Sequence, residues 1–190
     1  MNQTFPTQSD FAGTVAVVTG GSRGQGAAIC RLLAARGAAV VVSGRDEAGI
    51  ADVVAEIRAT GGRAIGVVTD CTDFAAIEGL RLRGEEAFGP ADLLVALAGG
   101  FRRMRRPGGN DDQLPVAAHL IATFLTVKSF LPGMVERRRG VIVTLPTVAV
   151  FARHLARSVA HHGVRVEQVA EMRVPAWGAF ITSGDVLLPA

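Results

Sequence analysis

Short runs of small and β-branched apolar residues alternate with longer amphipathic segments along this chain of 190 residues. The apolar runs predict strands at 13–19, 38–43, 64–69, 92–97, 140–145, 164–169 and 184–188. The segments between them predict helices at 24–36, 46–60, 73–87, 113–135 and 152–161. This alternation is typical of a parallel sheet buried on both faces. The sequence therefore predicts an α/β fold with a doubly wound parallel sheet, in a single domain over residues 1–190.

A glycine-rich turn joins the first predicted strand to the first predicted helix. It reads TGGSRGQG over residues 19–26, with the glycine spacing Gly-x3-Gly-x-Gly. Glycines at such a turn let the backbone approach a pyrophosphate, and the helix N-terminus offers unpaired N–H groups and a positive dipole end. The turn therefore predicts a dinucleotide site of the Rossmann type. Its predicted cofactor-binding residues are Gly20, Ser22, Arg23, Gly24, Gln25 and Gly26.

These motifs resemble those of the short-chain dehydrogenase/reductase family. TGGSRGQG fits the cofactor motif Thr-Gly-x3-Gly-x-Gly, and FLTVKSFLPGM, GVIVTLP and HGVRVEQVA are similar to later segments of the family. The resemblance spans nearly the whole chain, in pieces. It adds four cofactor-binding residues, namely Asp70 and Cys71 at the adenine and Ala98 and Gly99 after the fourth strand. It implies a nicotinamide-dependent oxidoreductase that reduces a carbonyl or oxidises an alcohol.

The residues after the second predicted strand favour NADP(H) over NAD(H). Sites for NAD usually place an acidic side chain there, to bind the ribose 2′-hydroxyl. This chain has Ser43, Gly44 and Arg45 at that place. Arg45 and Arg23 can pair a 2′-phosphate through charge-assisted hydrogen bonds. The alternative interpretation is that both arginines are merely solvated.

The catalytic residues that the resemblance implies are missing or altered. The family uses a Tyr whose phenol, with a pKa near ~10, needs a Lys one helical turn later to act near neutral pH. This chain contains no Tyr, and its single Lys, Lys128, lies in an earlier helix. Thr147 stands where the family has Ser, and His119 stands where it has Asn. Thr147 can hold a carbonyl oxygen and His119 can move a proton, although a lone His on a helix is more often structural.

Two functions therefore remain open. The first is an NADP(H)-dependent oxidoreductase of the short-chain type, and the second is a catalytically inactive nucleotide-binding relative that acts as sensor, scaffold or partner subunit. Only 16 residues separate Thr147 from Val164, where the sixth strand begins, so the turns that would carry Tyr and Lys are absent. Either the chain is a degenerate relative, or internal segments of a longer enzyme are missing from this sequence.

Charge and composition argue against several other classes. The formal net charge is +3, and the arginine clusters at 102–106 and 137–139 are interpreted as solvated charge, which argues against nucleic-acid binding. The first ten residues resemble no signal sequence, and we identify no apolar run approaching the ~20 residues of a membrane span. We expect a cytoplasmic protein without a membrane partner. Cys30 and Cys71 lack metal-ligand spacing, so we expect reduced thiols and no metal site.

Expectations about partners follow mainly from the resemblance. Family members usually pair through the helices before and after the fifth strand, which implies a homo-oligomer, most simply a dimer. The segments 100–112 and 170–183 show no clear periodicity and are candidate loops on the substrate side, with a plain surface connection as the equally weighted alternative. The expected substrate is a small carbonyl or alcohol. The basic residues of 101–106 could attract an anionic substrate such as an acyl thioester, but solvated charge is the favoured interpretation.

Overall fold

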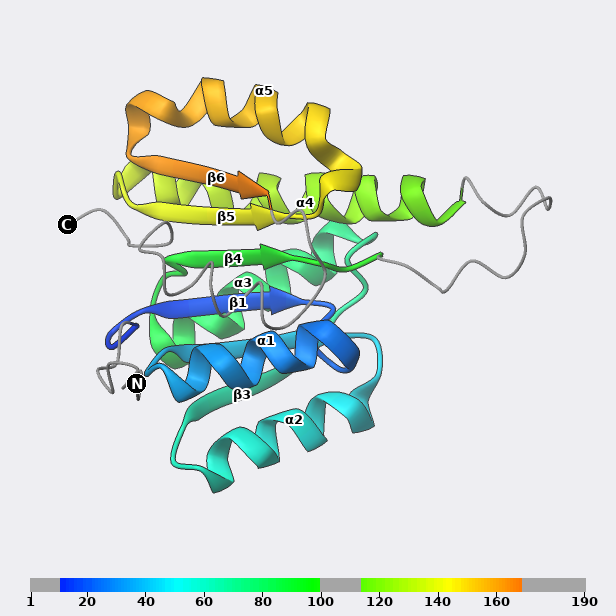
Figure 1. The fold of residues 1–190 in the computed structure, drawn as a ribbon, viewed down its shortest axis with the longest axis vertical. Helices are drawn as coiled ribbons and strands as arrows, with labels where there is room; N and C mark the ends of the chain where they lie inside the picture. The colour runs from blue at the N-terminus through cyan, green and yellow to red at the C-terminus, as the bar shows by residue number, and fades with distance from the viewer. Residues whose placement is uncertain (1–10, 100–113, 169–190) are drawn as a thin grey trace, which may run out of the picture.

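Six parallel strands form one sheet in the order β3-β2-β1-β4-β5-β6 (Figure 1). The computed structural model describes residues 11–99 and 114–168. Its strands are β1 (Val15–Thr19), β2 (Ala39–Gly44), β3 (Arg63–Val68), β4 (Leu93–Ala96), β5 (Gly140–Thr144) and β6 (Val164–Gln168). The strand order reverses between β1 and β4, which is the switch point of a doubly wound sheet. The predicted fold class is confirmed.

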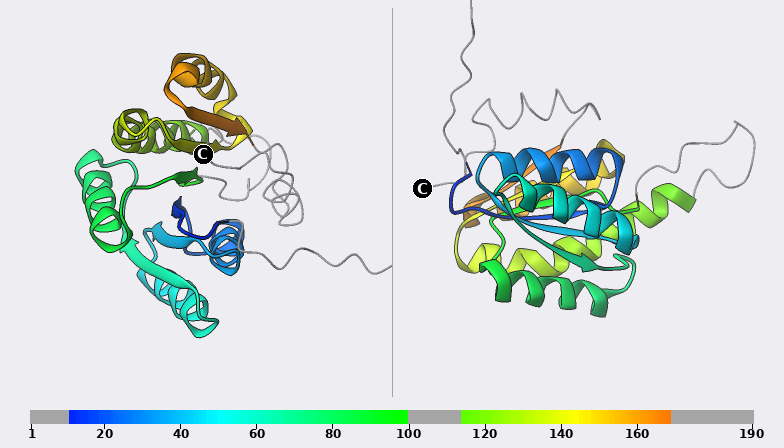
Figure 2. Two further views of the ribbon diagram at one scale, coloured as in Figure 1. Left: turned by 90° about the vertical axis from the view of Figure 1, so that its left-hand side faces the viewer. Right: turned by 90° about the horizontal axis from the view of Figure 1, so that it is seen from below.

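Helices cover both faces of the sheet. They are α1 (Gly24–Ala35), α2 (Glu47–Ala59), α3 (Phe74–Phe88), α4 (Leu114–Glu136) and α5 (Ala149–Val159). Short 3-10 helices, η1 (Pro146–Val148) and η2 (Ala160–His162), flank α5. Figure 2 shows α1 and α2 on one face and α3, α4 and α5 on the other. The described residues therefore form three layers around one sheet.

The core lies in two layers because the strands are apolar on both faces. In β1, Ala16 and Val18 pack in the cluster under α1 and α2, whereas Val17 packs in the cluster under α3 and α4. Val18 lies opposite Val42 of β2 and Val95 of β4 in the parallel register. Successive side chains of a strand point to opposite faces, so a continuous apolar run fills both layers.

The structure corrects one helix boundary substantially. The sequence predicts a helix from residue 152, whereas α5 begins at Ala149. Pro146 occupies the first turn of η1, where its missing N–H costs nothing, and η1 leads directly into α5. The predicted strand 184–188 and the loops 100–112 and 170–183 fall outside the described residues.

The apolar length of α4 requires a second correction. Residues Ala117–Glu136 form a 20-residue stretch of mean hydropathy 1.3, long and apolar enough to cross a membrane by length and composition alone. The expectation that no apolar run approaches the length of a membrane span is therefore wrong. Alanine raises the mean hydropathy of this stretch, and threonine and glycine barely lower it. In the fold, Val127 and Met134 of this helix pack in the core beneath α3 and α4. A core helix passes the same test, so the stretch is weak evidence for a span.

Candidate dinucleotide site

The glycine turn lies at the switch point between β1 and β4. Thr19, the last residue of β1, accepts the backbone N–H groups of Leu97 and Ala98 on its Oγ1, at 3.1 and 3.2 Å. A Cβ on Gly20 would lie 3.2 Å from backbone atoms of Leu97 and Ala98. The ends of the two strands are thus tied closely together, in the crevice where doubly wound proteins bind dinucleotides. Thr19 was not among the predicted site residues, although it opens the TGGSRGQG motif.

The predicted glycines have distinct roles in the turn. Gly20 and Gly24 adopt φ values of +75° and +56°, which favour glycine. A Cβ on Gly26 would lie 2.1 Å from the carbonyl oxygen of Gly20, so only glycine allows α1 to begin this close to β1. Ser22 packs over Gly44, because a Cβ added at Gly44 would lie 3.2 Å from the hydroxyl oxygen of Ser22. The turn is therefore fitted between β1, α1 and the end of β2.

The N-terminus of α1 has the form of an anion site. Its N-cap residue, Arg23, makes no side-chain capping bond and is exposed. The first N–H groups of a helix have no partner within the helix, so those of α1 remain available to a phosphate. The side-chain nitrogen of Gln25 is buried and has no hydrogen-bond partner among the described residues. These groups point to a bound anion rather than to a self-capped helix.

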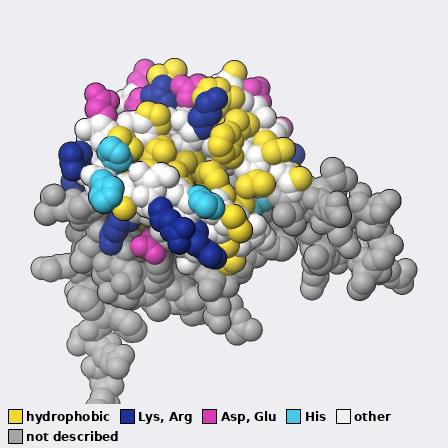
Figure 3. Space-filling view, turned by 90° about the horizontal axis from the view of Figure 1, so that it is seen from above, with side chains coloured by type: hydrophobic (Ala, Val, Ile, Leu, Met, Phe, Trp, Pro, Cys, Tyr) yellow, Lys and Arg dark blue, Asp and Glu magenta, His cyan; other side chains and the backbone are white. Residues whose placement is uncertain are grey.

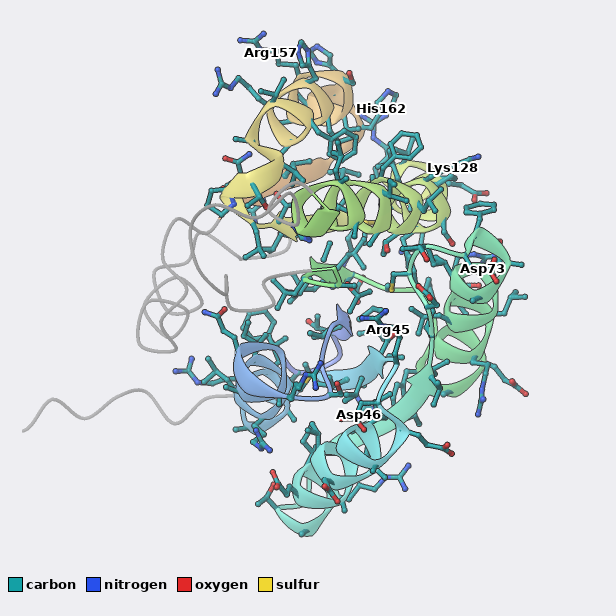
Figure 4. The ribbon with its side chains drawn as sticks, turned by 90° about the vertical axis from the view of Figure 1, so that its right-hand side faces the viewer. Arg45, Asp46, Asp73, Lys128, Arg157 and His162 are labelled. Carbon is teal, nitrogen blue, oxygen red and sulfur yellow. The ribbon has the colours of Figure 1, made fainter. Side chains whose placement is uncertain are left out.

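Arg45 and Asp46 follow the end of β2 and differ in role. Asp46 is the N-cap of α2, and its carboxylate accepts the N–H of Gly49 at 3.2 Å. Arg45 is exposed, and Figure 4 shows its side chain over the carboxyl ends of the strands, with Asp46 beside the start of α2. The acidic side chain nearest the expected ribose is therefore used for capping, and the basic one faces the crevice.

Asp70 and Cys71 follow β3 on the adenine side of the crevice. The Asp70 carboxylate is exposed and accepts the N–H and hydroxyl of Thr72, at 2.9 and 2.8 Å. These two bonds, more than the nearby Arg45, hold the pKa of Asp70 below its ordinary value. Cys71 is buried, and burial raises the pKa of its thiol to about 11. The thiol of Cys71 therefore lies in the core and is protonated near neutral pH.

His119 joins α4 to the turn after β4. Its side chain is 2% exposed, and its Nδ1 lies 2.7 Å from the carbonyl oxygen of Ala98. Gly99, at φ +76°, packs against the His119 backbone, where an added Cβ would come within 2.7 Å. Burial lowers the pKa of His119, and the bond to Ala98 offsets part of that effect. His119 is thus a neutral buried imidazole beside two predicted cofactor residues.

The remaining predicted catalytic residue lies on an element that contacts α4, whereas the only lysine faces α3. Thr147 lies in η1, directly after β5, and is exposed. Lys128 lies on the side of α4 that faces the start of α3, with its ammonium 4.6 Å from the ring centre of Phe74 (Figure 4). No lysine therefore reaches the substrate side of the described crevice.

The site divides into two halves. The β1–β2–β3 half has a glycine turn in which larger side chains would clash, an uncapped helix N-terminus and a basic residue at the end of β2. These features fit the pyrophosphate and adenosine of a dinucleotide. The β4–β5 half offers Thr147 and His119 instead of a Tyr and Lys. Fold and site together define a doubly wound dinucleotide-binding protein.

The comparisons with known proteins identify the family. The profile of the short chain dehydrogenase family matches residues 14–150. A short chain dehydrogenase of Pseudocercospora fijiensis is 32% identical over 146 residues, which cover 74% of this chain and 47% of that protein. The 3-oxoacyl-[acyl-carrier-protein] reductase FabG of Escherichia coli is 32% identical over 185 residues, covering 85% and 73%. The chain belongs to the short chain dehydrogenase family. It spans about half the length of the first of these relatives.

Solved structures agree with this assignment. A metagenomic short-chain oxidoreductase in complex with NADP has a TM-score of 0.75 and 28% identity, over 91% of this chain and 92% of that chain. A short chain dehydrogenase/reductase of Burkholderia phymatum in complex with NAD has a TM-score of 0.73 and 26% identity, over 84% and 65%. Relatives of this fold were thus solved with each nicotinamide cofactor, and the choice between them depends on this chain's own residues.

Proposed function

We propose that this protein is an NADP(H)-dependent oxidoreductase that reduces a carbonyl or oxidises an alcohol of a small molecule. The observation that carries the cofactor choice is the pair at the end of β2. Asp46 is engaged in capping α2, whereas Arg45 is exposed over the strand ends. A guanidinium pairs a 2′-phosphate in a planar, two-pronged geometry, and the Asp46 carboxylate, which could bind a 2′-hydroxyl, already accepts the N–H of Gly49.

Three parts of the chain have roles in the proposed reaction. When bound, the nicotinamide would supply or accept the hydride. The N–H groups at the start of α1 would bind the pyrophosphate, and the exposed hydroxyl of Thr147 would donate a hydrogen bond to the substrate oxygen. His119 would hold the turn after β4 in place through its bond to the Ala98 carbonyl.

A second candidate function is favoured by the position of Lys128. The chain contains no Tyr, and Lys128 contacts Phe74 instead of the crevice. A protein that binds NADP(H) without turnover would then act as a sensor, a scaffold or a partner subunit. Oxidation of NADPH in the presence of a panel of carbonyl compounds separates the two candidates. Turnover that is lost in Thr147→Val supports the enzyme, and binding without turnover supports the inactive relative.

Partners and location complete the proposal. The names of the relatives include a reductase of 3-oxoacyl-acyl carrier protein, so an acyl thioester is one carbonyl substrate to include in the panel. We place the protein in the cytoplasm, as a homodimer, with no nucleic-acid or membrane partner. Dimerisation is supported by exposed apolar side chains on α4 and α5, which Figure 3 shows as a continuous yellow surface.

The proposed cofactor choice is tested by Arg45→Ala. We expect it to weaken NADPH binding about tenfold, because a charge-assisted hydrogen bond contributes about 1.5 kcal/mol. Binding of NADH should not change, since NADH carries no 2′-phosphate. The matched control is Arg157→Ala, which removes an exposed arginine of α5. An unchanged affinity for NADPH in Arg45→Ala would refute the assignment.

A further inference from the structure

The tautomer of His119 is fixed by its hydrogen bond to Ala98. A backbone carbonyl oxygen can only accept, so the Nδ1 that lies 2.7 Å from the Ala98 oxygen must carry the proton. In the neutral ring the other nitrogen, Nε2, is then a bare acceptor. Nε2 is buried and has no hydrogen-bond partner among the described residues. The ring therefore makes one bond, and that bond holds the turn after β4.

A second proton on His119 would be buried on a nitrogen that has no hydrogen-bond partner among the described residues. The imidazolium would present an N–H at Nε2, and the buried, unpartnered side-chain polar atoms on the described parts of α4 and β5, besides Nε2 itself, are the hydroxyls of Thr123 and Thr144, which are uncharged acceptors. Both hydroxyls are buried and unpartnered among the described residues. A buried charge without full hydrogen bonding is costly, so protonation should be relieved by opening the contact between α4 and the turn.

No described charged group stabilises the imidazolium from a neighbouring element. The elements packed against α4 include α3, β4, β5 and η1, and β4, β5 and η1 contain no charged residue. On α3, Glu78 and Glu85 pair with Arg81, and Glu78 also accepts from Ser129. Ser129 lies ten residues beyond His119, about 15 Å along the helix. On α5, Arg153, His154 and Arg157 are exposed.

We propose that His119 is the positioning residue for the nicotinamide half of the cofactor site, and that it acts only as the neutral Nδ1–H tautomer. In a doubly wound fold the dinucleotide crosses the switch point, so the turn at Ala98 and Gly99 lies on the side opposite the adenosine. His119 holds that turn through the Ala98 carbonyl, and Gly99 packs on its backbone. This inference rests on the proposed function and adds acid sensitivity to one half of the site.

The test compares two probes that share the adenosine half. 2′-Phosphoadenosine 5′-diphosphoribose, a phosphorylated ADP-ribose, contains the 2′-phosphate and the pyrophosphate but no nicotinamide, whereas NADPH contains all three. The 2′-phosphate itself titrates near pH ~6, so its effect cancels in the ratio of the two dissociation constants. We expect the advantage of NADPH over the phosphorylated ADP-ribose to be constant from about pH 8 to about pH 6.5 and then to fall, by less than about tenfold, towards about pH 5.5, because the pKa of His119 lies below its usual 6.5.

Variants of His119 separate its hydrogen bond from its titration. His119→Asn keeps an N–H that can reach the Ala98 carbonyl but does not titrate. The ratio of the dissociation constants of the two probes for this variant should therefore be independent of pH. His119→Phe removes the donor, so NADPH should have little advantage over the nicotinamide-free probe at either pH. Thermal unfolding would confirm that this variant folds. The control His154→Asn changes an exposed histidine of α5 and should behave as the wild type.

Two results would overturn the inference. One is a wild-type ratio that does not change with pH, and the other is an equal fall in His119→Asn. Failure of the proposed function has a different signature, because the phosphorylated ADP-ribose would then not bind at any pH, and the inference would fall with it. Retained binding of the phosphorylated ADP-ribose with a constant ratio rejects the role of His119 alone.

Discussion

At the scale of single residues, Gly26 explains why the turn after β1 depends on glycine. A Cβ at this position would come within 2.1 Å of the Gly20 oxygen, which is backbone and cannot rotate away. The start of α1 and the end of β1 would have to separate. The same movement would spread the N–H groups that the proposed pyrophosphate site requires.

We predict that Gly26→Ala lowers the free energy of unfolding by about 2–3 kcal/mol, as overpacking does, and abolishes NADPH binding. Urea unfolding and cofactor titration measure the two effects. Gly79→Ala is the matched control, because the site of its Cβ on α3 is open and alanine is the better helix former. It should raise the free energy of unfolding by about 0.5–1 kcal/mol. Equal stabilities of the two variants would contradict the packing argument.

The sequence predicted the glycine turn after β1 better than the contacts of His119. Gly20, Gly24 and Gly26 could be predicted because the spacing of a tight turn is local and recurs between proteins. The bond from His119 to Ala98 could not, because 21 residues separate the partners and the spacing does not show which carbonyl a ring reaches. Its burial and fixed tautomer emerge only when α4 packs on the sheet.

At the scale of elements, one hydrogen-bonded group connects α3 to α4. Ser129 of α4 donates to Glu78 of α3, and Arg81 donates to the same carboxyl and to Glu85. The bond from Ser129 is the main cause that holds the pKa of Glu78 below its ordinary 4.5, followed by the bond from Arg81. The group contributes stability above pH 4.5, and this contribution is lost as the pH falls through the lowered pKa of the folded protein.

We predict that Ser129→Ala lowers the free energy of unfolding by about 1 kcal/mol near neutral pH. The difference from wild type should narrow as the pH falls below 4.5, because the carboxylate is then protonated in both proteins. Urea unfolding across that range measures the effect, with Ser158→Ala as the control, since that hydroxyl bonds only within α5. If the difference in the free energy of unfolding between wild type and Ser129→Ala persists unchanged in acid, Glu78 is not its source.

Elements were predicted more reliably than their ends. The β-branched runs of β1, β2 and β5 gave the strands directly, because a strand buried on both faces is apolar throughout. The start of α5 was placed three residues late, because Pro146 reads as a break in the sequence. In the structure it begins η1 instead, where a proline is tolerated.

At the scale of the whole molecule, α4 and α5 present an apolar surface to one side (Figure 3). Leu120, Ile121 and Phe124 of α4 and Val150 of α5 are between 43% and 69% exposed. Phe124 stacks edge-to-face on Phe151 of α5, so the two helices form one surface. A contiguous apolar surface of this kind marks an association site, and the proposed homodimer would bury it.

We predict that the protein has twice its chain mass of 19.8 kDa in solution. Phe124→Asp should give the monomeric mass, because a two-fold contact would bring two carboxylates into an apolar interface. Light scattering after gel filtration measures both. Leu82→Asp, at an exposed apolar position of α3, is the control and should leave the mass unchanged. A monomeric wild type would reject the pairing surface.

We propose that an NADP(H) site is formed by the glycine turn, the uncapped start of α1 and Arg45. Titration of the wild-type protein with NADPH and with NADH, followed by nicotinamide fluorescence, decides this point. We predict saturable binding of NADPH with an affinity at least about tenfold higher than that of NADH. Equal affinities would contradict the cofactor choice, and the absence of saturable binding would contradict the site itself.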